Sequence, residues 1–107
     1  MATGRNSDAW KRAIELTLEI YRATVSFPDE ELFGLTADMR HAAIRVTTSI
    51  AQQRFAEAET SLLELETQII VAARLDYLQK PVARRVYRLF RAALKALTPD
   101  RTSPGTA

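Results

Sequence analysis

The sequence predicts an all-α protein whose four helices run up, down, up and down in a single bundle. Glycine and proline are scarce, at three and four in 107 residues, and most lie at the ends of the chain or between periodic segments. The long stretches between them are rich in Ala, Leu, Glu and Arg, and each carries an apolar stripe at helical spacing. A chain of this length forms one domain. We expect residues 7–98 to form the bundle, with a flexible N-terminus over 1–6 and a disordered tail over 99–107.

The first helix is expected over residues 8–25, because Ser7 is a good N-cap and apolar residues then recur at steps of three and four. The residues predicted to form its buried face are Trp10, Ile14, Leu18, Tyr21 and Val25. A flanking stripe adds Ala13, Leu16 and Ile20, so more than one side of this helix is apolar.

Pro28 and Gly34 interrupt the pattern before a second helix, predicted over 37–52 with Thr36 as its cap. Its apolar stripe consists of Met39, Ala43, Val46 and Ile50. The side chains of Thr47, Thr48 and Ser49 compete for backbone hydrogen bonds. We therefore predict a tight turn at 52–54 rather than one long helix through this region.

The third helix, predicted over 55–78, is the most apolar of the four. One face holds Leu62, Leu65, Ile69 and Ala72, and beyond it lie Leu63, Ile70 and Val71. So wide an apolar surface indicates a helix that is central or that faces a second subunit. Pro81 fits the first turn of a fourth helix over 81–97. The inward stripe of that helix is Val82, Val86, Leu89, Phe90, Ala93 and Leu97.

Positive charge is concentrated on the fourth helix, although the net charge of the chain is only +2. Residues 80–97 contain no acid and six bases, namely Lys80, Arg84, Arg85, Arg88, Arg91 and Lys95. Four of these bases share one stripe about 16 Å long, with Arg85 beside it. Arginine forks suit phosphate, so binding to a nucleic-acid backbone is one interpretation of the stripe. Further bases that could support such binding are Lys11, Arg12, Arg22 and Arg54.

An alternative interpretation of the stripe is pairing with the third helix of the same or a neighbouring subunit. Residues 55–66 hold four glutamates and no base, namely Glu57, Glu59, Glu64 and Glu66. Tyr87 is the one aromatic candidate for stacking on bases among these cations, and a tyrosine packed at the bundle edge is the favoured interpretation.

Catalytic and metal-binding chemistry find little support. Glu64 and Glu66 stand two residues apart and point to different sides of a helix. We therefore expect one or the other to pair with Arg40 or Arg45 instead. Asp38 and His41 resemble half of a di-iron bundle site, but the chain has no second histidine. Cysteine, Gly-rich phosphate loops and nucleophile elbows are absent. We expect no catalytic residue, metal or cofactor, and a protein that is not an enzyme.

The segment "FPDEELFGLTADMRHAAIRVTTSIAQ" and the later "SLLELETQIIVAARLDYL" resemble the bacterial four-helix-bundle family first noted as proteins encoded in intervening sequences of 23S ribosomal RNA genes. The shared blocks are Phe27, Pro28 and Glu31; then Gly34, Leu35 and Thr36; then Arg40, Ala42 and Ala43. The last block runs from Ser61 to Gln68 and ends in Tyr77 and Leu78. The resemblance covers residues 10–97.

One part of the family pattern is missing. The intervening-sequence type has an S-I-P-x-N-I-A-E-G element and a Gly/Arg-containing loop, whereas residues 45–53 run almost directly into the third helix. The short connection is more similar to the branch that serves diversity-generating retroelements, the accessory variability determinant. That resemblance implies a homopentamer with a basic surface that binds the element's reverse transcriptase and its RNA or DNA.

Two other functions stay open: a protein of the intervening-sequence type, and a protein-only oligomeric module whose basic helix docks an acidic protein. The N-terminus lacks the apolar core of a signal peptide, and no apolar run approaches the roughly 20 residues that span a bilayer. We therefore expect a cytoplasmic protein without membrane contact.

Overall fold

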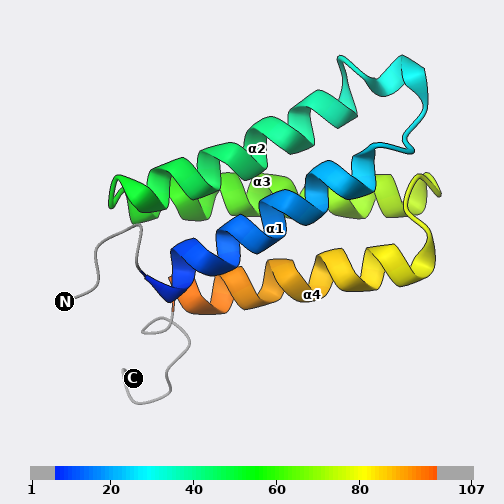
Figure 1. The fold of residues 1–107 in the computed structure, drawn as a ribbon. Coiled ribbons are helices and arrows are strands. Elements are labelled where there is room, and N and C mark those ends of the chain that lie inside the picture. Colours follow the sequence, from blue (N-terminus) through cyan, green and yellow to red (C-terminus); the bar gives the residue numbers. More distant parts are fainter. Residues whose placement is uncertain (1–6, 99–107) are drawn as a thin grey trace.

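The computed structural model describes residues 7–98, in which four α-helices follow one another in an up-down-up-down order (Figure 1). They are α1 (Asp8–Thr24), α2 (Leu35–Ala51), α3 (Phe55–Arg74) and α4 (Lys80–Leu97), and the 3-10 turn η2 (Asp29–Glu31) precedes α2. No strand occurs in this part of the chain. The all-α bundle is therefore confirmed. The predicted flexible N-terminus and disordered tail fall outside the described residues.

Two helix starts show how local side chains set the boundaries. The backbone N–H of Trp10 donates to Ser7 Oγ at 3.0 Å, so Ser7 caps α1 as predicted. The prediction for α2 is wrong, because this helix begins at Leu35 and Thr36 is buried in its first turn. The reason lies in η2, which places Glu31 Oε1 3.2 Å from the N–H of Leu35. The carboxylate of Glu31 thus accepts a hydrogen bond from the first turn of α2, the role that the hydroxyl of Thr36 was expected to have.

The tight turn between α2 and α3 lies at 52–54, as predicted. Gln53 adopts a left-handed backbone conformation with φ of 60°, and the N–H of Arg54 donates to the carbonyl of Ser49 at 2.8 Å. The end of α3 repeats this arrangement earlier than expected. Asp76 has φ of 62° and the N–H of Tyr77 donates to Ala72 at 2.9 Å, so α3 ends at Arg74 rather than at residue 78.

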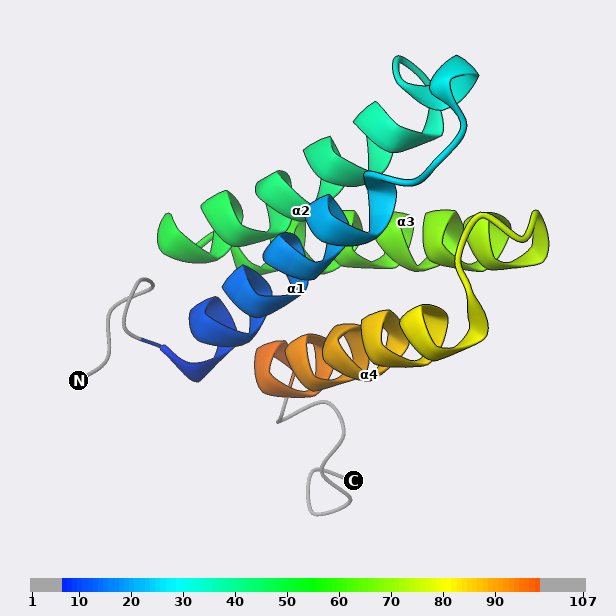
Figure 2. The same ribbon diagram turned by 45° about the vertical axis from the view of Figure 1, so that its right-hand side comes forward.

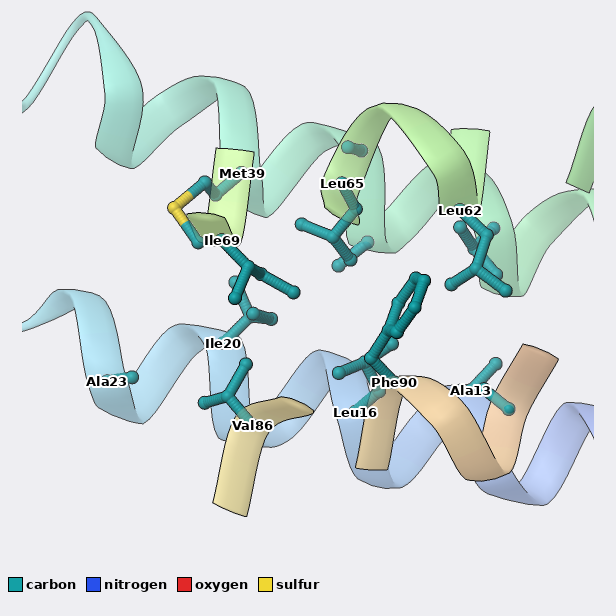
Figure 3. Packing of buried hydrophobic residues seen from close by; sticks show 14 of the residues in the cluster. Ala13, Leu16, Ile20, Ala23, Met39, Leu62, Leu65, Ile69, Val86 and Phe90 are labelled. Atoms are coloured by element: carbon teal, nitrogen blue, oxygen red, sulfur yellow. The ribbon is translucent and has the colours of Figure 1, made fainter. Parts of the chain in front are cut away.

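Each helix lies beside two neighbours, so the four are arranged as a square around one core. Figures 1 and 2 show α1 and α2 running alongside each other, inclined to α3 and α4. The core lies between these pairs, and Phe90 points from α4 toward Leu62 and Leu65 of α3 (Figure 3). The α2–α3 contact is the most extensive and the α3–α4 contact the least. The bundle is therefore least tightly closed between its last two helices.

The buried face of α1 is not the one predicted. Leu18, Tyr21 and Val25 are 48%, 38% and 76% exposed, whereas the expected flanking stripe of Ala13, Leu16 and Ile20 is buried. The cause is the close approach of α1 to α2. The hydroxyls of Thr17 and Thr47 lie 2.9 Å apart, a contact that brings the two backbones together. The larger side chains of the neighbouring stripe, Leu18, Tyr21 and Val25, consequently remain exposed to solvent.

Candidate nucleic-acid interface

The basic stripe of α4 lies opposite the core. Val86, Phe90 and Ala93 are buried, and on the other side of the same helix Arg84, Arg88, Arg91 and Lys95 are exposed. One helical turn separates successive members of the stripe, which places its four charges along about 16 Å of surface. Pro81 lies in the first turn of α4, and no acid occurs along this helix. All four cations therefore project from one rigid helix that carries no acid to neutralise them.

None of these four cations forms an ion pair within 4.0 Å among residues 7–98. Two acids of α3 have partners outside the stripe's cations. Glu64 pairs with Arg45 across the α2–α3 contact, as predicted, and Glu66 accepts a hydrogen bond from the hydroxyl of Tyr87 at 3.0 Å. Pairing of the stripe with the third helix of the same chain is therefore excluded for these residues.

A groove of about 720 Å³ opens between α3 and α4, beside the stripe. The residues that line it divide into an apolar floor and an arginine rim. The floor consists of Ile69, Ile70, Ala73, Ala83 and Tyr87. The rim consists of Arg74, Arg84, Arg88 and Arg91. No acid lines this groove, so its rim carries four positive charges over an apolar base.

Arg74 is the member of the rim that sequence reasoning missed. It occupies the last turn of α3, while Arg84 and Arg88 lie in the first half of the antiparallel α4. The signal was available, because the last turn of one helix lies beside the first turns of the next when a short connection joins them.

A second hollow of about 870 Å³ continues toward the C-terminal end of α4. Its apolar lining includes Leu63 and Leu94, and its charged lining includes Lys95 but also Glu59 and Glu66. Tyr87 and Arg91 line both hollows. The positive charge of the surface is therefore strongest at the Arg74 end and is balanced by acid at the Lys95 end.

Tyr87 stands at the junction of the two hollows and is half-buried. Its ring lies 5.6 Å from that of Phe90, in agreement with the predicted packing at the bundle edge. The hydrogen bond to Glu66, with the charge of that carboxylate and partial burial, raises the pKa of Tyr87 above its ordinary value of 10.0, while Arg91 opposes the shift. The ring is thus fixed from two sides.

Arg85 does not lie beside the stripe in the way expected. It projects toward α1, where its Nε donates to Glu19 Oε2 at 3.0 Å and a terminal nitrogen lies 2.9 Å from the same oxygen. Glu19 is buried, so the pair closes the α1–α4 contact. A step of one residue on a helix rotates the side chain by about 100°, which separates Arg85 from Arg84.

The four supporting cations also lie away from the groove. Arg22 is 4.0 Å from Glu19, Arg12 is 3.5 Å from Asp8, and Arg54 is 3.6 Å from Glu57. Lys11 is exposed on α1. The structure therefore brings Arg84, Arg88 and Arg91 together and leaves Lys11, Arg12, Arg22, Arg54 and Arg85 on other surfaces, three of these arginines held by local surface pairs.

The remaining chemistry-bearing side chains are dispersed. Within residues 7–98 no three His, Cys, Asp or Glu side chains gather where they could hold a metal ion. Every helix in that part of the chain is too short or too polar to cross a lipid bilayer.

Comparison with known protein families identifies the family of this chain. Residues 5–98 match the family described as "23S rRNA-intervening sequence protein". The match spans both segments that carry the resemblance and all four helices. A search among curated proteins finds no match.

Proposed function

Because the chain belongs to the 23S rRNA-intervening sequence protein family, and because its α4 stripe forms no ion pair within residues 7–98, we propose that it binds RNA through the phosphate backbone, without catalysing a reaction. The observation that carries the proposal is the arginine rim of the α3–α4 groove, namely Arg74, Arg84, Arg88 and Arg91, with no acid in its lining. Lys95 extends the same surface.

The energetics of α4 support a ligand for this rim. Like charges one turn apart destabilise a helix by a few tenths of a kcal/mol per pair, and Arg84, Arg88 and Arg91 form two such pairs. Interleaved glutamates would remove this cost, and α4 has none. A phosphate backbone supplies the missing negative charge, and guanidinium forks bind phosphate in a bidentate manner. Such binding is sensitive to salt and discriminates poorly between sequences.

Assembly into a homopentamer, which the family resemblance implies, belongs to the same proposal. Leu18, Tyr21 and Val25 form an exposed apolar stripe on α1, and a contiguous stripe of this kind is typical of a surface that another subunit covers. A closed ring would display five copies of the arginine rim. Linked copies raise the effective concentration of weak contacts and strengthen binding to a long RNA.

The narrower proposal is an accessory role in a diversity-generating retroelement, with its reverse transcriptase as protein partner and its template RNA or cDNA as ligand. The three-residue connection between Ala51 and Phe55 supports this branch over the intervening-sequence type. A reverse-transcriptase gene and a template/variable repeat pair beside the coding gene are expected under this proposal. An insertion of the gene within a 23S ribosomal RNA gene would favour the intervening-sequence type instead.

RNA binding is tested by a gel shift at low and moderate salt. The variant Arg84→Glu/Arg88→Glu/Arg91→Glu is compared with the wild type and with a control of the same charge change, Lys11→Glu/Arg12→Glu/Arg22→Glu. We expect the α4 variant to lose the shifted band and the α1 variant to retain most of it. Circular dichroism confirms that both variants keep their helices.

Retention of RNA by the α4 variant, at the level of the wild type, would show that the arginine rim is not the binding surface. A wild type that ignores RNA, yet captures an acidic protein from a nuclease-treated lysate, would replace the proposal with the protein-only module.

A further inference from the structure

We infer that the α3–α4 groove is a site for single-stranded RNA, in which the bases lie on the apolar floor while the arginine rim holds the phosphates. The inference rests on the proposed RNA binding and adds the form of the RNA that is bound. Its starting point is the adjacency of two unlike surfaces in one groove: an apolar floor around Ile70 and Tyr87, and a rim of four arginines.

A double helix would use only half of this site. Its phosphates could contact the rim, but its bases are paired and stacked inside, so the recessed floor would face nothing apolar. A single strand exposes both parts along one chain, and proteins that bind it combine a cationic groove with side chains on which bases stack. The groove therefore fits the chemistry of a single strand better than that of a duplex.

Tyr87 is the side chain suited to receive a base. Its hydroxyl is held by Glu66 at 3.0 Å and its ring packs near Phe90 at 5.6 Å, so the ring is fixed before any ligand arrives. Side chains fixed in advance lose little conformational entropy on binding. Arg91 lines both hollows next to this ring and can add guanidinium stacking to its contact with phosphate.

The distribution of charge sets the extent of the site. The run from Arg84 to Arg91 covers about 10 Å of α4, which matches roughly three bases at a stacked spacing of 3.4 Å. Beyond Tyr87 the second hollow is lined by Glu66 as well as by Arg91 and Lys95, so acid offsets part of the positive charge there. We therefore place the strand at the Arg74 end of the groove rather than along the full length of α4.

The test compares two RNAs on the full chain by fluorescence anisotropy: a labelled ten-nucleotide oligouridine and a labelled ten-base-pair duplex. We expect the protein to bind the single strand at least about fivefold more tightly. Tyr87→Leu keeps an apolar side chain but removes the aromatic ring. It should weaken single-strand binding about five- to tenfold and leave duplex binding unchanged. Tyr87→Phe keeps the ring and its contact with Phe90 but loses the hydrogen bond to Glu66, so it should bind the single strand more tightly than Tyr87→Leu does.

Crosslinking gives a second measurement that needs no variant. A wild-type complex with 4-thiouridine RNA, irradiated and digested, should carry crosslinks in the peptides that contain Ile70, Tyr87 and Arg91. Crosslinks confined to α1 or α2 would overturn the inference even if Tyr87→Leu failed to fold.

The outcomes separate this inference from the function on which it rests. Equal affinity for the two RNAs, with no effect of Tyr87→Leu, would overturn the single-strand site and leave backbone binding intact. No binding of either RNA would overturn both. A change in oligomeric mass on Tyr87→Leu, with single-strand binding unaffected, would overturn the inference by showing that a second copy covers the groove.

Discussion

Arg84 and Arg85 are adjacent in α4 but lie on two sides of the helix and have different roles. On the α1 side Arg85 meets the buried carboxylate of Glu19 at 2.9 Å, and that contact closes the bundle. On the α3 side Arg84 and its stripe neighbours meet no carboxylate within the described chain, and an open groove lies beside them. One side of the helix thus uses its charge for the fold, and the other leaves its charge available to a ligand.

The difference teaches that the partners of a basic helix must be known before its charge can be interpreted. Six cations on α4 look alike in the sequence. Packing separates them, because α1 presents a buried acid to α4, whereas Glu64 and Glu66 of α3 are engaged by Arg45 and Tyr87. An arginine that neutralises a buried carboxylate is costly to lose, and an exposed unpaired one is cheap to lose.

A pair of alanine variants tests this difference between the two sides of α4 with the largest expected effect. Arg85→Ala removes the closer partner of the buried Glu19 and, in the described part of the chain, leaves only Arg22 at 4.0 Å. It should lower the free energy of unfolding by about 1.5 kcal/mol, a reduced figure for a buried pair because Arg85 is itself 46% exposed. Arg84→Ala makes the same change of residue type one position away and should alter the free energy of unfolding by less than about 0.5 kcal/mol. Urea unfolding at pH 7 measures both. Equal losses would contradict a division of roles between the two sides.

A smaller effect, of opposite sign, is expected inside the stripe. Arg88 lies one turn from both Arg84 and Arg91, so Arg88→Gln removes two like-charge contacts and should raise the free energy of unfolding by about 0.5 kcal/mol. The same variant should bind RNA more weakly than the wild type. Thermal unfolding at low salt checks the first effect and anisotropy the second. Destabilisation by Arg88→Gln would show that the stripe contributes to the fold after all.

The smallest effect concerns Tyr87 and pH. The pKa of Tyr87 is raised in the folded protein, chiefly by its hydrogen bond to Glu66, and that of Tyr77 is raised in the same way by Glu31. A raised pKa means that the tyrosine hydroxyl keeps its proton to a higher pH in the folded state than in the unfolded chain. The stabilisation is complete below the ordinary value of 10.0 and is lost as the pH rises past it. Urea midpoints between pH 8 and pH 11 should fall less steeply in Tyr87→Phe than in the wild type, and an identical fall would contradict the assignment.

Much of the fold followed from periodicity, and the failures have physical causes. Met39, Val46, Val86 and Phe90 are buried as their spacing predicted, because each of these helices has a single apolar stripe. Helix α1 has two, and spacing cannot choose between them. The choice was made by the Thr17–Thr47 contact, a tertiary interaction between residues 30 positions apart.

The candidate site was predictable only in outline. The alignment of Arg84, Arg88 and Arg91 follows from helical geometry, so the stripe could be drawn from the sequence. The pairing of Arg85 with Glu19 could not, since it joins residues 66 positions apart. The groove itself depends on the weak α3–α4 contact, which no local pattern encodes.

The account's central claim, that the groove side of α4 binds RNA, is tested most directly by the salt dependence of RNA affinity. The variant Arg84→Gln/Arg88→Gln/Arg91→Gln and its control Lys11→Gln/Arg12→Gln/Arg22→Gln lose equal charge. If the three α4 arginines contact phosphates of a single strand, the α4 variant's slope of log affinity against log salt should be shallower by about 2, with the control's slope close to the wild type's. Equal slopes for the two variants would contradict the claim.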